Sequence, residues 1–159
     1  MQYNIFKGNT SMVENYKSHG DESIYMGEKI SGKDCPDYLR HFVTTDAGEG
    51  AYCYLDVVRQ PVSGGFRYFV KNSDNTLKYV ISDLKDVYLK VTDSDGDLVW
   101  YEDETVIDRR GPEAGVYWRV IEFKDETRKI AKKQFIDSRK IVTYRNGEVK
   151  TYDEYDEEY

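Results

Sequence analysis

The chain has 159 residues, a formal net charge of −7, 2 Cys and 2 His, and 14% of its residues are aromatic. This length suits one domain, and the apolar content excludes wholesale disorder. No apolar run reaches the ~18 residues of a spanning helix, no secretory signal is visible, and two cysteines form no disulfide framework. We therefore expect a cytoplasmic protein with no membrane contact.

The first fifty residues predict short, mixed elements. Tyr3 and Ile5 suggest a brief strand, and the Ser-x-x-Glu pattern that begins at Ser11 is a capping box opening a helix over 11–19. Residues 23–30 fit a strand. Residues 34–43 are ambiguous: Pro36 suits a first helical turn, which would place Tyr38, Leu39 and Phe42 on one face.

From residue 51 the apolar pattern has a period of two and is rich in β-branched and aromatic residues, as expected of strands. Turns are predicted at 60–65, 72–75, 95–96 and 146–147, with a loop around Gly111-Pro112. The predicted strands cover 51–59, 66–71, 76–82, 87–92, 97–102, 116–123, 141–145 and 148–152.

Seven or more strands with two or three short helices predict a mostly β (α+β) fold. Its form would be an antiparallel sheet or a small barrel with the helices at the periphery. We expect a single β-rich domain over 1–152, followed by a flexible acidic tail over 153–159.

Acidic residues concentrate at the end of the sequence. The last seven residues carry five acids and no base, so the remainder has a net charge of only −2. Such carboxylates suit the basic cleft of a protein partner. The candidate partner-binding residues are Glu102, Asp103, Glu104, Asp153, Glu154, Asp156, Glu157 and Glu158.

Basic residues cluster just before this tail. Six bases fall within residues 128–140, with Asp137 the one acid among them. If 125–136 is a helix, four of these bases share one side, which is either a solvated charged face or a contact for phosphates. The candidate nucleic-acid-binding residues are Arg128, Lys129, Lys132, Lys133, Arg139 and Lys140.

Tyrosine is abundant, with 15 residues along the chain. Alternate tyrosines cover half-buried sheet faces, and they also enrich contact surfaces, where aromatic and Arg side chains can stack on bases. The candidates for stacking are Arg67, Tyr68, Trp118, Arg119, Tyr144 and Arg145.

Metal and cofactor patterns are weak. Asp93, Asp95 and Asp97 have calcium-loop spacing, but Leu98 stands where the loop requires Gly. Cys35, Cys53, His19 and His41 lack the short spacing of zinc ligands. No phosphate-binding glycine loop or nucleophile motif occurs, so we expect no cofactor, no metal and no identifiable catalytic residue.

These observations favour a non-enzymatic interaction or regulatory protein that binds and modulates a macromolecular partner. The composition is compatible with an inhibitor-like accessory protein of a virus or mobile element, acting on a host nucleic-acid-processing enzyme. One alternative is a nucleic-acid-binding module that uses the basic residues. Another is a small enzyme with an Asp/Glu-based site. The oligomeric state is left open.

Overall fold

The computed structural model describes residues 26–113 and 115–153. These residues form two compact units. Unit 1 comprises 26–85 and 91–97, and unit 2 comprises 86–90, 98–113 and 115–153. The strand expected near Tyr3, the helix expected over 11–19 and most of the acidic tail lie outside the described residues. None of the described helices has the length or apolar character that a membrane span requires.

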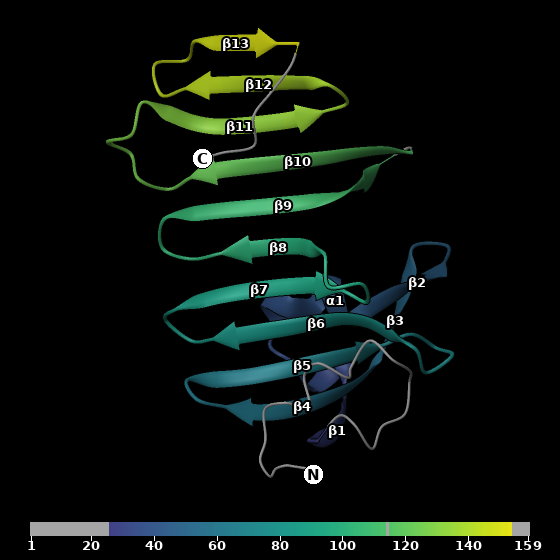
Figure 1. Ribbon diagram of the computed structural model, residues 1–159. Coiled ribbons are helices and arrows are strands. Elements are labelled where there is room, and N and C mark those ends of the chain that lie inside the picture. The colour runs from purple at the N-terminus through teal and green to yellow at the C-terminus, as the bar shows by residue number, and fades with distance from the viewer. Residues whose placement is uncertain (1–25, 114, 154–159) are drawn as a thin grey trace. The chain divides into compact units, whose positions relative to one another are not determined.

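Unit 1 is built on an antiparallel sheet with strand order β1-β4-β5-β6 (Figure 1). The strands are β1 (Glu28–Ser31), β4 (Asp56–Val62), β5 (Gly65–Lys71) and β6 (Leu77–Leu84). Val58, Phe69, Leu77 and Val80 form a buried cluster on it. Burial of these side chains is the main stabilising contribution to this unit.

Between β1 and β4 the chain forms short helices and a hairpin. The elements are the 3₁₀ turns η3 (Gly32–Asp34) and η4 (Asp37–Leu39), helix α1 (Arg40–Val43), and strands β2 (Thr44–Gly48) and β3 (Ala51–Tyr54). Leu39, Phe42 and Val43 are buried, so these short helices serve to place apolar side chains. Residues 34–43 therefore form short helical segments and not one continuous helix.

Strand β7 (Tyr88–Asp93) is divided between the units. Unit 2 continues as an antiparallel meander in which each strand from β8 to β13 pairs with the next (Figure 1). Its strands are β8 (Leu98–Glu102), β9 (Val106–Glu113), β10 (Val116–Phe123), β11 (Ile130–Ile136), β12 (Arg139–Tyr144) and β13 (Val149–Tyr152). Its core cluster is Val106, Ile121, Phe123 and Phe135.

The predicted class is confirmed: the fold is mostly β and antiparallel, with a few short helices. Within the described part of each unit the strand order is open, so a sheet and not a small barrel is the form observed. Strands predicted at 66–71, 76–82, 87–92 and 116–123 match β5, β6, β7 and β10 closely.

The predicted helix over 125–136 is wrong. Asp125 begins a tight turn, in which its carboxylate accepts the N–H of Thr127 (2.9 Å) and its carbonyl accepts the N–H of Arg128 (3.1 Å). The chain then enters β11, where Lys133 and Phe135 are both buried. A buried lysine hides the period of two, because its charge makes the strand pattern look like a helical one.

Two prolines occur inside strands, where the sequence predicted turns or loops. Pro61 lies in β4 beyond the residues that pair with β1, and Pro112 lies in β9 beyond those that pair with β8. Because no described strand pairs with these positions on that side, the absence of a proline N–H removes no hydrogen bond between strands. Because Pro112 indicated a loop, strand β9 was not predicted. The strand predicted over 51–59 is divided at Leu55 into β3 and β4.

Gly65 begins β5 against the backbone of β6. A Cβ added there would lie 2.0 Å from the carbonyl oxygen of Asp83, an atom that cannot move without disturbing the ladder. We expect Gly65→Ala to lower the free energy of unfolding by about 1–3 kcal/mol, measured by urea denaturation. Ser63→Ala in the adjoining turn is the control, and an equal effect of the two substitutions would contradict this reading.

Candidate functional site

The six predicted basic residues do not share one surface, because most of them lie on strands. Successive side chains of a strand project to opposite faces. Lys132 and Lys133 of β11 therefore point to different sides of the sheet, as do Arg139 and Lys140 of β12. Arg128 and Lys129 lie in the turn between β10 and β11.

The register of unit 2 nevertheless gathers bases on one side. Lys133 and Lys140 share a face with Arg110, Arg119 and Lys150, since Ile121 pairs with both Asp108 and Lys133, and Val142 pairs with Lys150. We call this side of β9–β13 the cationic face. Among the described strand residues on it, the one acid is Asp108, which is 1% exposed.

Aromatic rings alternate with these bases. Lys140 lies 5.0 Å above the ring of Tyr152, and Lys150 lies 5.5 Å above that of Tyr144. Nearer the middle of the sheet, Arg119 lies 5.7 Å from the Phe135 ring. Arg128 also reaches this side from its turn, 3.8 Å from the Phe123 ring. The rings hold the cations against the sheet through cation–π attraction.

Between β9 and β10 of the cationic face, Asp108 binds Arg119 with two hydrogen bonds. Nε of Arg119 donates to Oδ1 at 3.1 Å, and Nη2 donates to Oδ2 at 2.9 Å. Nη2 of Arg110 lies 3.8 Å from Oδ2 of the same carboxylate. A bidentate pair of this kind fixes the plane of the guanidinium. Asp108 is therefore a positioning residue for the arginines around it.

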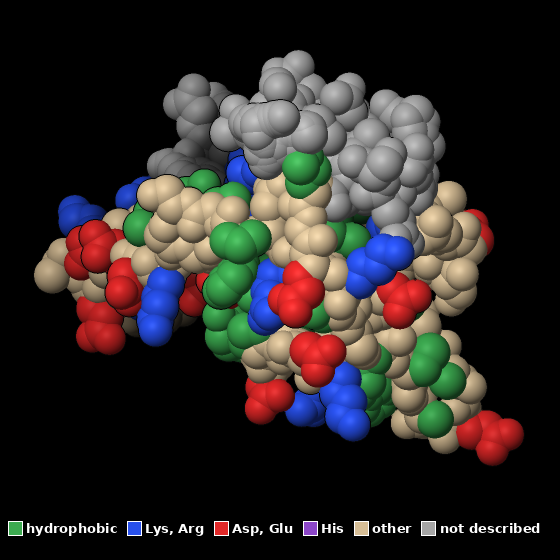
Figure 2. Space-filling model, turned by 90° about the horizontal axis from the view of Figure 1, so that it is seen from below, with side chains coloured by type: hydrophobic (Ala, Val, Ile, Leu, Met, Phe, Trp, Pro, Cys, Tyr) green, Lys and Arg blue, Asp and Glu red, His purple; other side chains and the backbone are tan. Residues whose placement is uncertain are grey.

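The opposite side of the same strands has mixed charge. Arg109 forms an ion pair with Glu122 and also lies 5.5 Å from the Trp100 ring. Lys132 stands directly across from Glu122 in the β10–β11 register. Bases on this side lie close to carboxylates, so the face does not carry charge of one sign. Another face of the molecule is similarly mixed, with acidic and basic side chains side by side (Figure 2).

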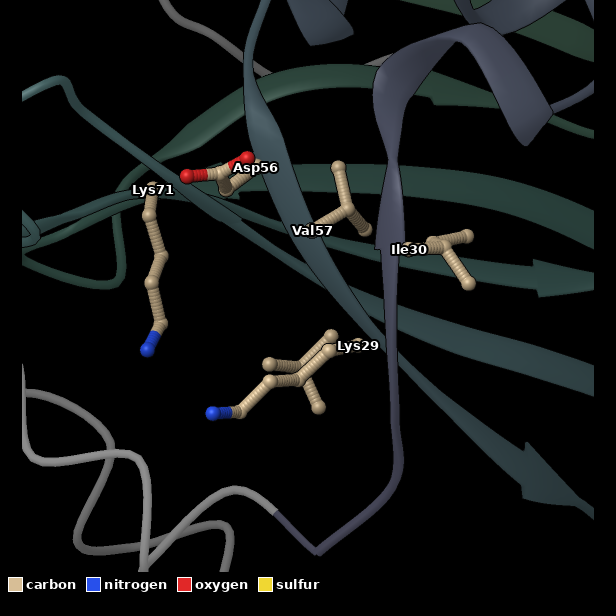
Figure 3. Close-up of a pocket in the computed structure, with 6 residues that line it drawn as sticks. Lys29, Ile30, Asp56, Val57 and Lys71 are labelled. Atoms are coloured by element: carbon tan, nitrogen blue, oxygen red, sulfur yellow. The ribbon is translucent and has the colours of Figure 1, made fainter.

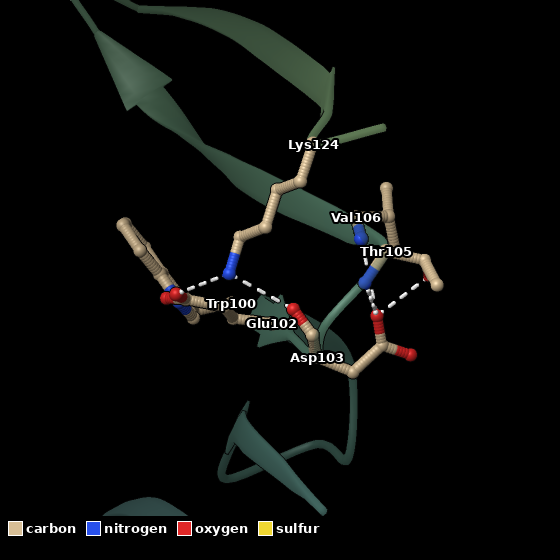
Figure 4. A network of polar contacts seen from close by, with 6 residues as sticks. All are labelled: Trp100, Glu102, Asp103, Thr105, Val106 and Lys124. Carbon is tan, nitrogen blue, oxygen red and sulfur yellow. Dashed lines mark hydrogen bonds and ion pairs between the residues drawn. The ribbon is translucent and has the colours of Figure 1, made fainter. Parts of the chain in front are cut away.

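Two of the three predicted acidic residues at 102–104, Glu102 and Asp103, have structural contacts (Figure 4). Lys124 donates to the carboxylate of Glu102 at 2.8 Å and to the carbonyl of Asp103 at 2.9 Å. Oδ1 of Asp103 accepts the N–H and hydroxyl of Thr105, both at 2.7 Å, and the N–H of Val106 at 3.0 Å. Glu104 is exposed beside them.

The Asp103 turn is one of three with the same local sequence, Asp-x-Thr. Asp74 and Asp125 accept the N–H and hydroxyl of Thr76 and Thr127 in the same way. These bonds lower the pKa values of Asp74 and Asp125. For Asp103, burial opposes ionisation, but the hydrogen bonds it accepts outweigh burial, and its pKa is lowered as well. Sequence inspection could have found this motif by its spacing.

The other predicted contact residues are dispersed. Asp153 is exposed after β13, and Glu154, Asp156, Glu157 and Glu158 lie outside the described residues. Of the predicted stacking residues, Arg119 and Tyr144 belong to the cationic face, whereas Tyr68 is only 2% exposed. Sequence reasoning missed Arg110 and Lys150, because neither lies in the basic cluster and only strand register brings them to this face.

Unit 1 contains two smaller features. A pocket of about 200 Å³ is lined by Lys29, Ile30, Asp56, Val57, Val58 and Lys71, with the two lysine side chains extending toward the same side (Figure 3). It holds a single carboxylate, so it lacks the paired acids that an Asp/Glu-based enzyme site would need. The carboxylates of Asp93, Asp95 and Asp97 lie within 4.8 Å of one another. Oδ1 of Asp93 accepts hydrogen bonds from the backbone N–H groups of Asp95 and Asp97 in a hairpin turn.

Comparisons with protein-family models, with curated proteins and with solved structures found no match. The cationic face is therefore interpreted from its own geometry.

The Asp108–Arg119 pair generates a stability prediction. Removing a buried carboxylate leaves its cationic partners uncompensated, so Asp108→Ala should lower the free energy of unfolding by about 3 kcal/mol. Asp108→Asn should have a smaller effect in the same direction. Glu113→Ala, an exposed acid on the same strand, is the matched control for net charge, and urea denaturation of the three variants provides the measurement. Similar losses for Asp108→Ala and Glu113→Ala would refute the role of the pair.

Asp103 gives the fold a pH dependence. Its pKa lies below the ordinary value of 3.8, so the stability it contributes is fully present above that pH and disappears as the pH falls through its lowered pKa. Asp103→Asn should therefore reduce the free energy of unfolding by about 1 kcal/mol at pH 7, with the difference from the native chain shrinking by pH 3. Chemical denaturation at both pH values tests this. Glu104→Gln should change the free energy of unfolding little at either pH. A loss of stability in Asp103→Asn that is the same at both pH values would rule the mechanism out.

Proposed function

We propose that the protein is a non-enzymatic binding protein and that the cationic face of unit 2 binds single-stranded nucleic acid. The observation that carries this proposal is that Arg110, Lys140 and Lys150 are partly or fully exposed on one side of β9–β13, with aromatic rings between them. Lys133 and Arg119 lie on the same side but are largely buried, with exposed fractions of 8% for Lys133 and 12% for the Arg119 side chain. Separated cations of this kind can bind the phosphates of a nucleic-acid backbone, and nucleic-acid bases can stack on the exposed rings.

An unpaired strand fits this surface better than a duplex. A duplex is recognised in its grooves by an inserted helix or β-ribbon, and unit 2 presents a broad sheet side. Sheet surfaces bind single strands by stacking bases on outward-facing rings while cations follow the backbone. Tyr117, which is 79% exposed, and Tyr152, which is 40% exposed, are the rings best placed for stacking.

A protein partner is the broader form of the same proposal. An accessory protein of a virus or mobile element, acting in the cytoplasm on a nucleic-acid-processing enzyme, would need surfaces for both macromolecules. Glu102 is bound by Lys124, and Asp103 is bound within its own turn. These contacts give less support to an acidic patch at 102–104 than the cationic face gives to nucleic acid.

Bases on the two sides of the sheet in unit 2 allow a matched charge-reversal experiment. Lys140→Glu combined with Lys150→Glu reverses two charges on the cationic face, and Lys132→Glu combined with Arg139→Glu reverses two on the other side. We expect the first pair to weaken binding to a labelled oligothymidine by tenfold or more and to reduce the salt slope by roughly 1.4, at about 0.7 for each lost phosphate contact. The second pair should have a much smaller effect.

Fluorescence anisotropy at several salt concentrations provides the measurement. Equal losses in the two double variants would mean that net charge alone governs binding, and an absence of binding by the native chain at low salt would reject the proposed function. Tyr117→Ala should weaken binding with the salt slope unchanged, because stacking releases no counterions.

A further inference from the structure

We propose that the acidic segment 154–159 docks on the cationic face of its own chain and competes there with nucleic acid. The competition rests on the proposed function of that face, whereas the docking does not. The segment follows Asp153 directly and has the sequence Glu-Tyr-Asp-Glu-Glu-Tyr. It therefore carries four carboxylates and two aromatic rings, the groups that complement a row of cations on a sheet.

Charge balance supports this occupant. The described residues 98–113 and 115–153 contain 12 Lys and Arg and 11 Asp and Glu, a balance of +1. Of the five bases of the cationic face, Arg119 is bound by Asp108 and Lys133 is buried. The bases that a segment can reach from solvent are therefore Arg110, Lys140 and Lys150. The four carboxylates of segment 154–159 are enough to offset the charge of these three bases, and a covalent connection keeps them near the face at a high effective concentration.

Chain length supports the same conclusion. Strand β13 ends at Tyr152, beside Lys140 of β12. Six extended residues span about 20 Å, and neighbouring strands lie about 4.8 Å apart. The segment can therefore cross from β13 over β12 and β11 to β10 or β9, which covers the strands that carry the bases. Lys150 and Lys140 lie closest to its point of attachment.

The first test needs no nucleic acid. In the full-length chain the four acids of the segment are replaced by their amides (Glu154→Gln, Asp156→Asn, Glu157→Gln and Glu158→Gln). If the segment docks, acetylation of Lys140 and Lys150, followed by mass spectrometry, should proceed about threefold or more faster in this variant than in the native chain. Lys78 in unit 1 should be unaffected. Unchanged rates at Lys140 and Lys150 would overturn the docking.

A control variant separates docking from net charge. It neutralises four exposed acids of unit 2 outside the segment, and thus changes the total charge by the same amount (Glu104→Gln, Glu113→Gln, Glu126→Gln and Glu148→Gln). Faster acetylation of the two lysines in this variant, to the same degree, would also overturn the docking. Circular dichroism checks that both variants keep the native fold.

The second test is affinity for oligothymidine at low salt. The segment variant should bind about three- to tenfold more tightly than the native chain, and the control variant should gain less. Tight binding by both the native chain and the segment variant, with equal affinities, would overturn the competition and leave the proposed function intact. Faster lysine acetylation without nucleic-acid binding by any variant would support docking and reject the proposed function. The two failures are therefore distinguishable.

Discussion

A buried carboxylate organises the cationic side of unit 2. Asp108 is almost completely removed from solvent, and its two oxygens hold the guanidinium of Arg119 in a bidentate pair with Arg110 nearby. Burial of a single carboxylate would be strongly unfavourable, so the surrounding arginines are required where they are. The pair offsets the charge of Arg119, and it reduces the repulsion between Arg119 and Arg110.

Around this pair the sheet uses ring faces to hold its remaining cations. The ammonium groups of Lys140 and Lys150 each lie over a tyrosine ring of the neighbouring strand. This arrangement differs from the mixed-charge side, where Arg109 and Lys132 stand beside Glu122. Two sides of the same strands thus have different electrostatic character, and that difference defines the candidate site.

The Asp-x-Thr turns show a more local level of organisation. In each of them one carboxylate oxygen satisfies a backbone N–H and a hydroxyl two residues later, which reverses the chain without a glycine at a left-handed position. Asp103 therefore contributes to the fold, although the sequence grouped it with a partner-binding patch. Acidic residues in strand-to-strand connections deserve this structural interpretation before a functional one.

The strand pattern from residue 51 onward determined the mostly β, antiparallel class, because side chains that alternate between core and solvent leave a period of two in the sequence. Turn chemistry likewise located the hairpin at Asn146-Gly147. Only the tertiary structure decided that Lys132 and Lys133 belong to opposite sides, that Pro61 and Pro112 lie in strands, and that Arg110 joins Lys150 across four strand pairings. These outcomes depend on register between strands distant in sequence, and register is fixed by the packing of both faces together, which no local pattern records.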